Sequence, residues 1–416
     1  MVDRRDALVL GAGIVGVSVA LHLQARGLSV ALIDRGEPGG ETSYGNAGFI
    51  ELSAIAPHPF PKGLSNLAGL ALNRSPAVRS DPAFFPWIAP WLFAYWKASG
   101  DKRLPAIAAA FRTLTSHALA EHEALMHAAG AEDLLRRDGW LELCRSESQL
   151  AEADRAAEPA RALGVAANKI DAGAIARMVP SLLPGFAGAI HWTDTVRVSD
   201  PGGLVRALAA LFSERGGQFL KADAMRLRKE QRWRLATANG EIEAEHAVVA
   251  LGPWSGDLIG RFGHYLPLAV KRGYHRHFAQ VPGAELMRPV YVRDEACLIV
   301  PTRQGIRVLS GVELARRDAP PSPIQLESVV KSARKTITMG VPVEQQPWMG
   351  ARPCMPDMLP VIGQAPNQRG LWFAFGHGHF GFTLGPLTGR LVAEMITGST
   401  PLVDPQPYLP DRFRLG

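Results

Sequence analysis

The first 34 residues alternate apolar runs with a glycine-rich turn, in the order strand, turn, helix, strand. The run 7–10 predicts a buried strand, and residues 14–26 have a helical apolar periodicity that ends at Gly27. Residues 28–34 predict a second strand that ends at Asp34. This order is typical of the first βαβ unit of a parallel sheet that binds a dinucleotide.

The pattern changes after residue 50, where prolines break up the apolar runs and alanine-rich helical periodicity follows to about residue 135. Sheet-like segments return at 139–144 and 188–192. Residues 199–216 predict a capped helix that leads into a strand over 218–227. A β-rich passage begins after residue 262. We interpret the changed segments as two insertions that together form a second domain.

The predicted fold class is α/β. A Rossmann-type domain, discontinuous in sequence, is expected to be joined by an α+β domain with a mainly antiparallel sheet. The expected ranges are 1–55, 199–262 and 346–416 for the first domain, and 56–198 and 263–345 for the second.

Composition narrows the function classes. The chain has 416 residues and a formal charge of +6, spread without a long single-sign block, so a nucleic-acid-binding arm is not expected. Its three cysteines, Cys144, Cys297 and Cys354, are too few and too far apart for a disulfide framework or a zinc site. A cytoplasmic location is the prediction.

The aromatic segment 84–96 is too short for the roughly 20 residues that span a bilayer, and it contains two prolines. Its residues Phe84, Ile88, Trp91, Leu92 and Tyr95 have helix-face spacing. Two interpretations stay open: core packing, or an interfacial patch that rests on the inner face of the membrane.

The motif Gly11, Gly13, Gly16 follows a strand and opens a helix, the context that makes GxGxxG informative. Gly11 permits a tight turn, Gly13 admits a pyrophosphate, and Gly16 allows the helix to pack on the strand. With Ile14 and Val15, the start of the helix offers free N–H groups to an anion. An ordinary turn is the alternative.

Asp34, followed by Arg35, has the spacing of an acid that binds an adenosine ribose. Nicotinamide and flavin dinucleotides share that ADP half, so this motif does not choose between them. Residues 41–48, ETSYGNAG, add hydroxyl and amide groups where a second cofactor half would extend, although a polar surface turn would look the same.

Five motifs together resemble those of the FAD-dependent amine and amino acid oxidoreductases, a family that includes D-amino acid dehydrogenase, glycine oxidase and sarcosine oxidase. They are GAGIVG, TSYGNAG, VVALGPWS, MGARPCMPDMLPVIG and FGHGHFGFTLGPLTGRLVAE, and they extend over the whole chain. SYGNAG and the RPxxPDxLPxIG pattern are most similar to the D-amino acid dehydrogenase branch.

The resemblance implies non-covalent FAD and a set of cofactor residues. Cys354 lies near the position where sarcosine oxidases attach flavin through sulfur, which is the less favoured alternative. Backbone N–H groups near residue 380 are expected to stabilise the reduced ring. The implied cofactor residues are Gly11, Gly13, Ile14, Val15, Gly16, Asp34, Arg35, Thr42, Ser43, Asn46, Ala47, Gly48, Ala224, Leu251, Gly252, Trp254, Gly378, His379, Phe380, Gly381, Phe382 and Thr383.

Arg352 matches the family position whose arginine binds the substrate carboxylate, a role that suits a planar, permanently charged guanidinium. A structural ion pair is the alternative. A tyrosine of glycine oxidase-like members is replaced here by Leu298. Tyr274 and His275 are the predicted polar groups of the catalytic site in its place, with packed strand residues as the alternative.

The implied reaction is oxidative deamination of an amino acid, with a D-amino acid or a cyclic or secondary amino acid favoured (EC 1.4 or 1.5). A hydride would pass to flavin N5, and the imino acid would be hydrolysed to a keto acid and ammonia. Quinone or oxygen would accept the electrons. Alternatives are a glycine or sarcosine oxidase, a nicotinamide-dependent dehydrogenase, and a flavin-carrying subunit without catalysis.

His377 and His379 raise the question of a metal site. They lie in a glycine-rich segment with no carboxylate or cysteine nearby, which supplies too few ligands. The prediction is no metal.

Overall fold

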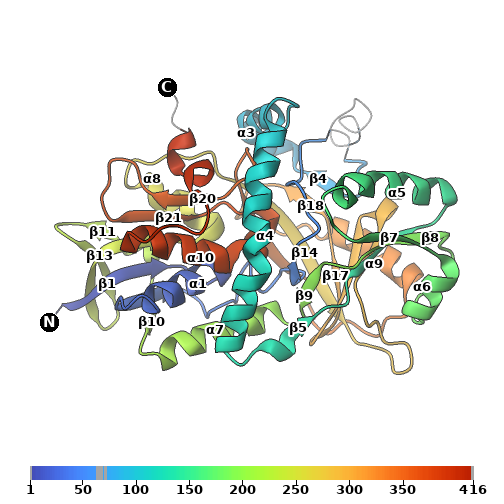
Figure 1. Ribbon diagram of the computed structural model, residues 1–416, viewed down its shortest axis with the longest axis horizontal. Coiled ribbons are helices and arrows are strands. Elements are labelled where there is room, and N and C mark those ends of the chain that lie inside the picture. Colours follow the sequence, from blue (N-terminus) through green and yellow to red (C-terminus); the bar gives the residue numbers. More distant parts are fainter. Residues whose placement is uncertain (1, 62–68, 70–72, 414–416) are drawn as a thin grey trace.

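The computed structural model describes residues 2–61, 69 and 73–413, and it forms two lobes side by side along its longest axis (Figure 1). Within the described residues, the first lobe contains an eight-stranded sheet. Its main path runs β10(Gln218–Lys221), β2(Val30–Asp34), β1(Asp3–Leu10), β13(Gly240–Val249), β12(Trp233–Thr237) and β11(Arg228–Lys229), and β21(Leu371–Phe375) joins β13 to β20(Val361–Gln364).

The central strands of this sheet are parallel and buried on both faces. β1 pairs in parallel with β2 and β13, and β10 pairs in parallel with β2. Ala7 and Val9 pack in one apolar cluster, whereas Leu8 and Leu10 pack in another on the opposite face. A strand that is covered on both faces reads as a continuous apolar run, which explains the pattern ALVL.

Helices cover both faces of the first sheet. One face carries α1(Ile14–Gln24), α7(Pro201–Glu214) and α10(Gly381–Thr397), and the other carries α8(Ser255–Gly260). The predicted helix over 199–216 is α7, and the Asp200 side chain caps it by accepting a hydrogen bond from Gly203 N at 2.8 Å.

The second lobe contains, within the described residues, a ten-stranded sheet in which most pairs are antiparallel. Its order is β4(Val78–Ser80), β18(Val312–Leu314), β14(Ala269–Phe278), β17(Gly305–Leu309), β16(Cys297–Thr302), β15(Val290–Val292), β6(Trp140–Cys144), β8(Gly188–Trp192) and β7(Ala167–Asp171), with β19(Trp348–Cys354) paired to β14. The helices α5(Glu147–Arg161), α6(Ala172–Met178) and α9(Ile324–Thr336) pack on it. A small sheet of β3(Phe49–Ile50), β9(Val196–Val198) and β5(Leu135–Arg136) completes the strands.

The lobes differ from the expected ranges in two places. β19 lies in 346–416 but pairs with β14 of the second sheet. The long helix α4(Leu104–Ala128) falls in the range expected for the second domain, but it packs on α10 of the first lobe. It runs along the front of the molecule between the lobes (Figure 1). The reason is its apolar face, from which Phe111 meets Phe380 at 4.6 Å between ring centroids. The domain boundaries themselves stay a prediction.

The aromatic segment forms α3(Phe85–Ala98), which is buried on one face and exposed on the other. Ile88, Trp91 and Tyr95 are buried, as the core-packing interpretation requires. Trp87 and Trp96 on the same helix are 69% and 57% exposed. No helix in the described ranges combines the length and the apolar character needed to cross a bilayer.

Candidate active site

A cavity of about 1610 Å³ lies where the two lobes meet. Its wall is formed by the turn after β1, the start of α1, residues 42–43 and 45–47, α3, strands of the second sheet and the start of α10. Pockets for a single small ligand are commonly about 300–1,000 Å³. This cavity therefore has room for a dinucleotide together with a small substrate.

The glycine-rich turn presents the start of α1 to one end of the cavity. Gly11 has φ +107°, and a Cβ there would collide with the carbonyl oxygen of Ala250, so only glycine fits. Gly13 caps α1 without any side-chain hydrogen bond. Ile14 N donates to Ser43 Oγ at 3.0 Å. The first turn carries no acidic residue, which leaves its positive potential to an anion.

Gly16 does not line the cavity, because its α-hydrogen faces the carbonyl of Gly11, where a Cβ would overlap. It serves the close packing of helix on strand that the motif predicts. Gly48 is likewise outside the cavity wall. Its φ of +83° and its position against the Val198 carbonyl make it a turn residue.

Asp34 lies at the end of β2 in the cavity wall. One carboxylate oxygen accepts Ala12 N at 2.7 Å and the other accepts Gly36 N at 2.9 Å. The next residue, Arg35, places its guanidinium 4.4 Å from the ring centroid of Trp254. This end of the cavity combines an acid with an apolar ring, as a ribose and an adenine require.

Ala224 lines the same end, but it does not lie on a strand, and this corrects the prediction of a strand over 218–227. β10 ends at Lys221, and residues Ala224–Arg226 form a turn of 3₁₀ helix. The cause is Asp223, whose side chain accepts a hydrogen bond from Met225 N at 2.9 Å and so favours the turn.

The loop 42–48 is fixed between the lobes. Thr42 Oγ1 donates to Ala351 O at 2.9 Å, and Asn46 Oδ1 accepts Gly48 N at 2.7 Å. Arg307 of β17 donates to the carbonyl oxygens of Tyr44 and Asn46, the first at 3.0 Å. Burial lowers the pKa of Arg307 to about 10. The sequence did not predict this role of Arg307. Its strand is distant in sequence from the loop 42–48, and no local pattern indicates that the two come together.

The glycine-rich segment before α10 forms the opposite wall. Residues 378–383 all line the cavity, and α10 begins at Gly381. His122 Nε2 contacts Phe382 O at 2.8 Å, and burial lowers the pKa of His122 to about 4, so the ring is neutral. Gly385 lies outside the cavity wall and packs on Ile14 of α1.

His377 is a buried structural residue. Its Nε2 lies 2.9 Å from Thr388 Oγ1, and burial lowers the pKa of the ring to about 3. Among the described residues, one group has the geometry of metal ligands, and it includes neither His377 nor His379. It consists of His275, His277 and Glu344. Arg307 Nε donates a hydrogen bond to His277 Nε2 at 2.9 Å. The positive charge of this guanidinium disfavours the binding of a metal cation at the same group.

Arg352, the residue predicted to bind the substrate carboxylate, lies in the cavity wall on β19. Its guanidinium lies against Gly273, where a Cβ would be 2.5 Å from Nη1, and Nη1 donates to Arg272 O at 3.3 Å. Within the described ranges Arg352 has no ion pair with a carboxylate. The alternative of a structural ion pair is therefore not supported.

Lys271 is a cavity residue that sequence reasoning missed. Its ammonium nitrogen lies 4.4 Å from the ring centroid of Tyr95 and 5.2 Å from that of Trp91. Side chains alternate along a strand, so Lys271, Gly273 and His275 share one face of β14, and Tyr274 shares the other with Arg272. The sequence shows which residues of β14 share a face, because side chains alternate along a strand. It does not show which of the two faces meets the cavity.

Neither Tyr274 nor His275 lines the cavity, which does not support their predicted contact with substrate. The Tyr274 hydroxyl donates to Glu313 Oε2 at 2.6 Å on the far face of the strand. His275 is on the nearer face, but it stacks on Trp348 with 4.8 Å between ring centroids, and Trp348 itself lines the cavity. The indole thus separates the imidazole from the cavity.

A different tyrosine lines the cavity beside Leu298, which stands at the expected position of the family tyrosine. Tyr291 lies opposite Leu298 in the β15–β16 pair, and both residues line the cavity. Burial raises the pKa of Tyr291, so it stays protonated and can donate a hydrogen bond. Cys354 is buried outside the cavity wall, and burial raises the pKa of its thiol. That position disfavours a covalent flavin link.

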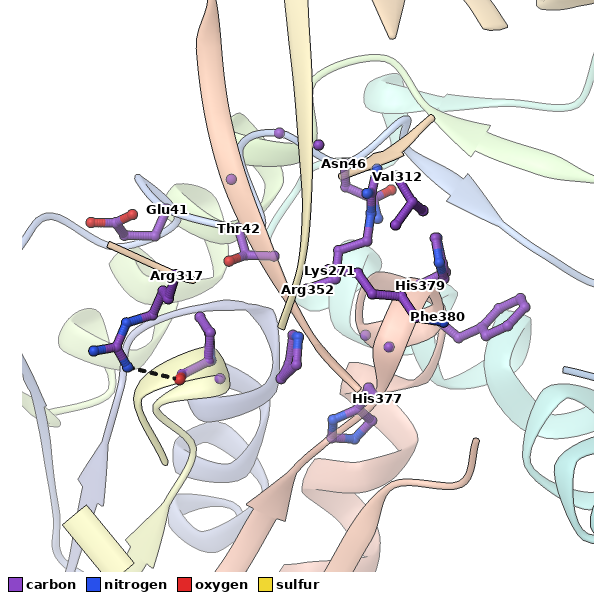
Figure 2. Close-up of a pocket in the computed structure, with 18 of the residues that line it drawn as sticks. Glu41, Thr42, Asn46, Lys271, Val312, Arg317, Arg352, His377, His379 and Phe380 are labelled. Carbon is purple, nitrogen blue, oxygen red and sulfur yellow. Dashed lines mark hydrogen bonds between the residues drawn. The ribbon is translucent and has the colours of Figure 1, made fainter. Parts of the chain in front are cut away.

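Apart from Gly16 and Gly48, the predicted cofactor residues all lie in one cavity wall. They are Gly11, Gly13, Ile14, Val15, Asp34, Arg35, Thr42, Ser43, Asn46, Ala47, Ala224, Leu251, Gly252, Trp254, Gly378, His379, Phe380, Gly381, Phe382 and Thr383. Figure 2 shows the two ends of the wall, with Glu41 and Arg317 at one side and Lys271, His379 and Phe380 at the other. Their individual roles stay predictions.

The protein has a parallel sheet with a nucleotide-binding turn, and a second, mainly antiparallel sheet lies beside it. This architecture is typical of two-lobed enzymes that use a nucleotide cofactor. The family model DAO, described as FAD dependent oxidoreductase, matches residues 6–395, and the chain belongs to this family. It is an oxidoreductase that uses FAD. The anion site at α1, the acid at Asp34 and the long cavity fit this cofactor.

The chain is similar to curated relatives along its whole length. It is 31% identical to the D-amino-acid oxidase of Bradyrhizobium diazoefficiens, with 99% of this chain and 100% of the relative covered. It is 29% identical to the glycine oxidase of Pseudomonas putida, with the same coverage. The crystal structure of glycine oxidase from Geobacillus kaustophilus has a TM-score of 0.74 at 23% identity and covers 100% of both chains, a likeness of fold.

Proposed function

We propose that the protein oxidatively deaminates a free amino acid, with the D enantiomer preferred. The observation that carries the proposal is Arg352, a guanidinium without an ion pair in the described residues, set in the cavity wall beside the predicted flavin residues. Such a group stabilises a carboxylate and fixes the orientation of the neighbouring carbon. The similarity to D-amino-acid oxidase supports the choice of substrate class.

The protein's part in this reaction is mainly placement. Bound FAD supplies the two-electron oxidation. Arg352 holds the carboxylate, and the amine enters uncharged. The substrate loses a hydride from Cα and a proton from nitrogen, and one water then converts the imine to a keto acid and ammonia.

Glycine or sarcosine oxidation is the second candidate. The similarity to glycine oxidases favours it, and Tyr291 lies opposite Leu298, the position at which the resemblance leads us to expect a tyrosine in that group. A cyclic or secondary amino acid fits the same arrangement. Kinetics with D-alanine, D-proline, glycine and sarcosine separate these substrates by their kcat/KM values.

The test is anaerobic mixing of the FAD-loaded protein with D- and L-amino acids, followed by flavin absorbance. We expect bleaching by D-amino acids. No bleaching across the panel would contradict the proposal and favour a flavin-carrying subunit without catalysis. Repeating turnover with oxygen and then with a quinone or dye identifies the electron acceptor.

We also propose that the exposed face of α3 contacts a membrane surface. Trp87 and Trp96 are exposed, and Arg316 lies over Trp87 at 4.8 Å from the ring centroid. Lys97 is exposed in the last turn of the helix, and Lys102 is exposed in the turn that follows it. Aromatic rings flanked by cations suit an anionic lipid surface.

Co-sedimentation with vesicles tests this contact. We expect binding to phosphatidylglycerol vesicles, little binding to neutral phosphatidylcholine vesicles, and loss of binding in Trp87→Ser/Trp96→Ser. Equal behaviour of wild type and variant would contradict it.

A further inference from the structure

Lys271 and Arg352 lie directly opposite each other in the antiparallel pair β14–β19. Opposite residues place their side chains on the same face of the sheet, with Cβ atoms about 4.5–5.5 Å apart, and like charges there are destabilising. Both side chains line the cavity, and Figure 2 shows them side by side near His379. The fold thus places two basic side chains where one would bind a simple amino acid carboxylate.

No carboxylate in the described part of the chain compensates these cations. Neither Lys271 nor Arg352 forms an ion pair there. Glu51 also lines the cavity, but its carboxylate accepts hydrogen bonds from Ser53 and Thr195, the latter at 3.1 Å, and burial raises its pKa.

The two neighbouring histidines carry no negative charge that could compensate Lys271 and Arg352, and their own pKa values are lowered. Burial is the main cause that lowers the pKa of His379 and of His58, and the charges of Lys271 and Arg352 lower both further. Both rings are therefore neutral. Tyr95 contacts the ammonium through its ring face, which attracts a cation without removing its charge.

We propose that the substrate is an acidic amino acid, whose α-carboxylate binds Arg352 and whose side-chain carboxylate binds Lys271. This inference rests on the proposed function and names the substrate class of the same site. A neutral amino acid would leave one buried cation unpaired, whereas a dicarboxylate pairs both. Lys271 is in this account the residue that determines specificity.

Isosteric substrate pairs test the inference. D-aspartate is compared with D-asparagine, and D-glutamate with D-glutamine, in the wild type and in Lys271→Met. We expect the wild type to prefer the acid by about tenfold or more in kcat/KM, and the variant to lose that preference because its kcat/KM falls more for the acids than for the amides. Lys169→Met, at an exposed lysine on β7, is the matched control and should keep the preference.

A binding measurement makes the result independent of turnover. Perturbation of the flavin spectrum by succinate or glutarate is compared with that by butyrate. Wild type should bind the dicarboxylates more tightly, and Lys271→Met should bind all three alike.

The outcomes separate the two proposals. An equal loss for acids and amides in Lys271→Met, or a wild type that prefers the amides, would overturn the inference and leave deamination standing. If no amino acid bleaches the flavin, the proposed function fails. The dicarboxylate titration then still decides whether Lys271 and Arg352 form a site for two carboxylates.

Discussion

Gly385 of α10 packs on Ile14 of α1, so close that a Cβ at position 385 would lie 2.9 Å from Ile14 Cγ1. Four residues further on, Gly389 meets the backbone of Ser18 in the same way. Small residues at this spacing on α10 let the two helices approach closely. The contact brings the start of α10 beside the start of α1, so that both helix N-termini border one cavity.

Gly385→Val should therefore disturb the cofactor site without touching the cofactor. The added side chain must displace Ile14 at the phosphate end, at a cost of about 1–3 kcal/mol. We expect a lower thermal midpoint and weaker FAD binding, measured by fluorescence of released flavin. Gly256→Ala is the control, because a Cβ there would have its nearest contact at an ordinary 3.7 Å. Full FAD affinity in Gly385→Val would refute this role.

Residue 381 and residue 377 should respond differently to substitution. Gly381 lines the cavity with an ordinary helical φ of −60°, and a Cβ would lie 3.4 Å from His377 Cβ. Gly381→Ala should keep FAD, whereas Gly381→Phe should lose it by filling the cavity. His377→Ala leaves Thr388 without its buried partner and should cost about 1–3 kcal/mol of stability while most FAD stays bound. Flavin-to-protein absorbance ratios check all three variants.

Tyr274→Phe should behave as a structural variant. The hydroxyl donates to Glu313 and accepts from Arg272 Nη2 at 2.6 Å and from Ser322 N at 2.9 Å. Its removal should lower the free energy of unfolding by about 1–3 kcal/mol. Because Tyr274 is outside the cavity wall, kcat/KM should change by no more than about twofold. A large fall in kcat/KM at unchanged stability would restore the predicted catalytic role.

The preference for dicarboxylates should depend on pH. Burial lowers the pKa of Lys271, and Arg352 lowers it further. The ammonium binds an anion only while protonated, so the preference should be complete below this lowered pKa and decline as pH rises through it. The other titratable groups at this site are His58, His379, Cys354 and Tyr95.

Glutarate and butyrate titrations between pH 6 and 10 measure this dependence. We expect their ratio of dissociation constants to fall toward one at a pH below the ordinary lysine value of about 10.4. A ratio that stays constant over this range would contradict an ion pair with Lys271.

The sequence was sufficient where the cause of a structure is local. The glycines at 11 and 16, the capped helix within 199–216 and the end of β2 at Asp34 each depend on a few neighbouring residues, and the structure places them as expected. The resemblance likewise placed Arg352 in the cavity wall. These are features of single turns and motifs.

The sequence was insufficient where pairing between distant segments decides the result. Which face of β14 meets the cavity depends on its register with β19, and this excluded Tyr274 and admitted Lys271. Arg307 fixes the loop 42–48 from a strand more than 250 residues away. The position of α4 depends on its contact with α10, a helix more than 250 residues further along the chain.

The central claim is that Arg352 binds the substrate carboxylate of an amino acid oxidised in this cavity. Anaerobic flavin reduction by D-amino acids is measured in the wild type, in Arg352→Gln and in the exposed control Arg215→Gln. The account predicts rapid bleaching in the wild type and control, and a loss of about 3 kcal/mol, roughly 100-fold in kcat/KM, in Arg352→Gln with full FAD content. Unchanged bleaching in Arg352→Gln, or none in the wild type, would contradict it.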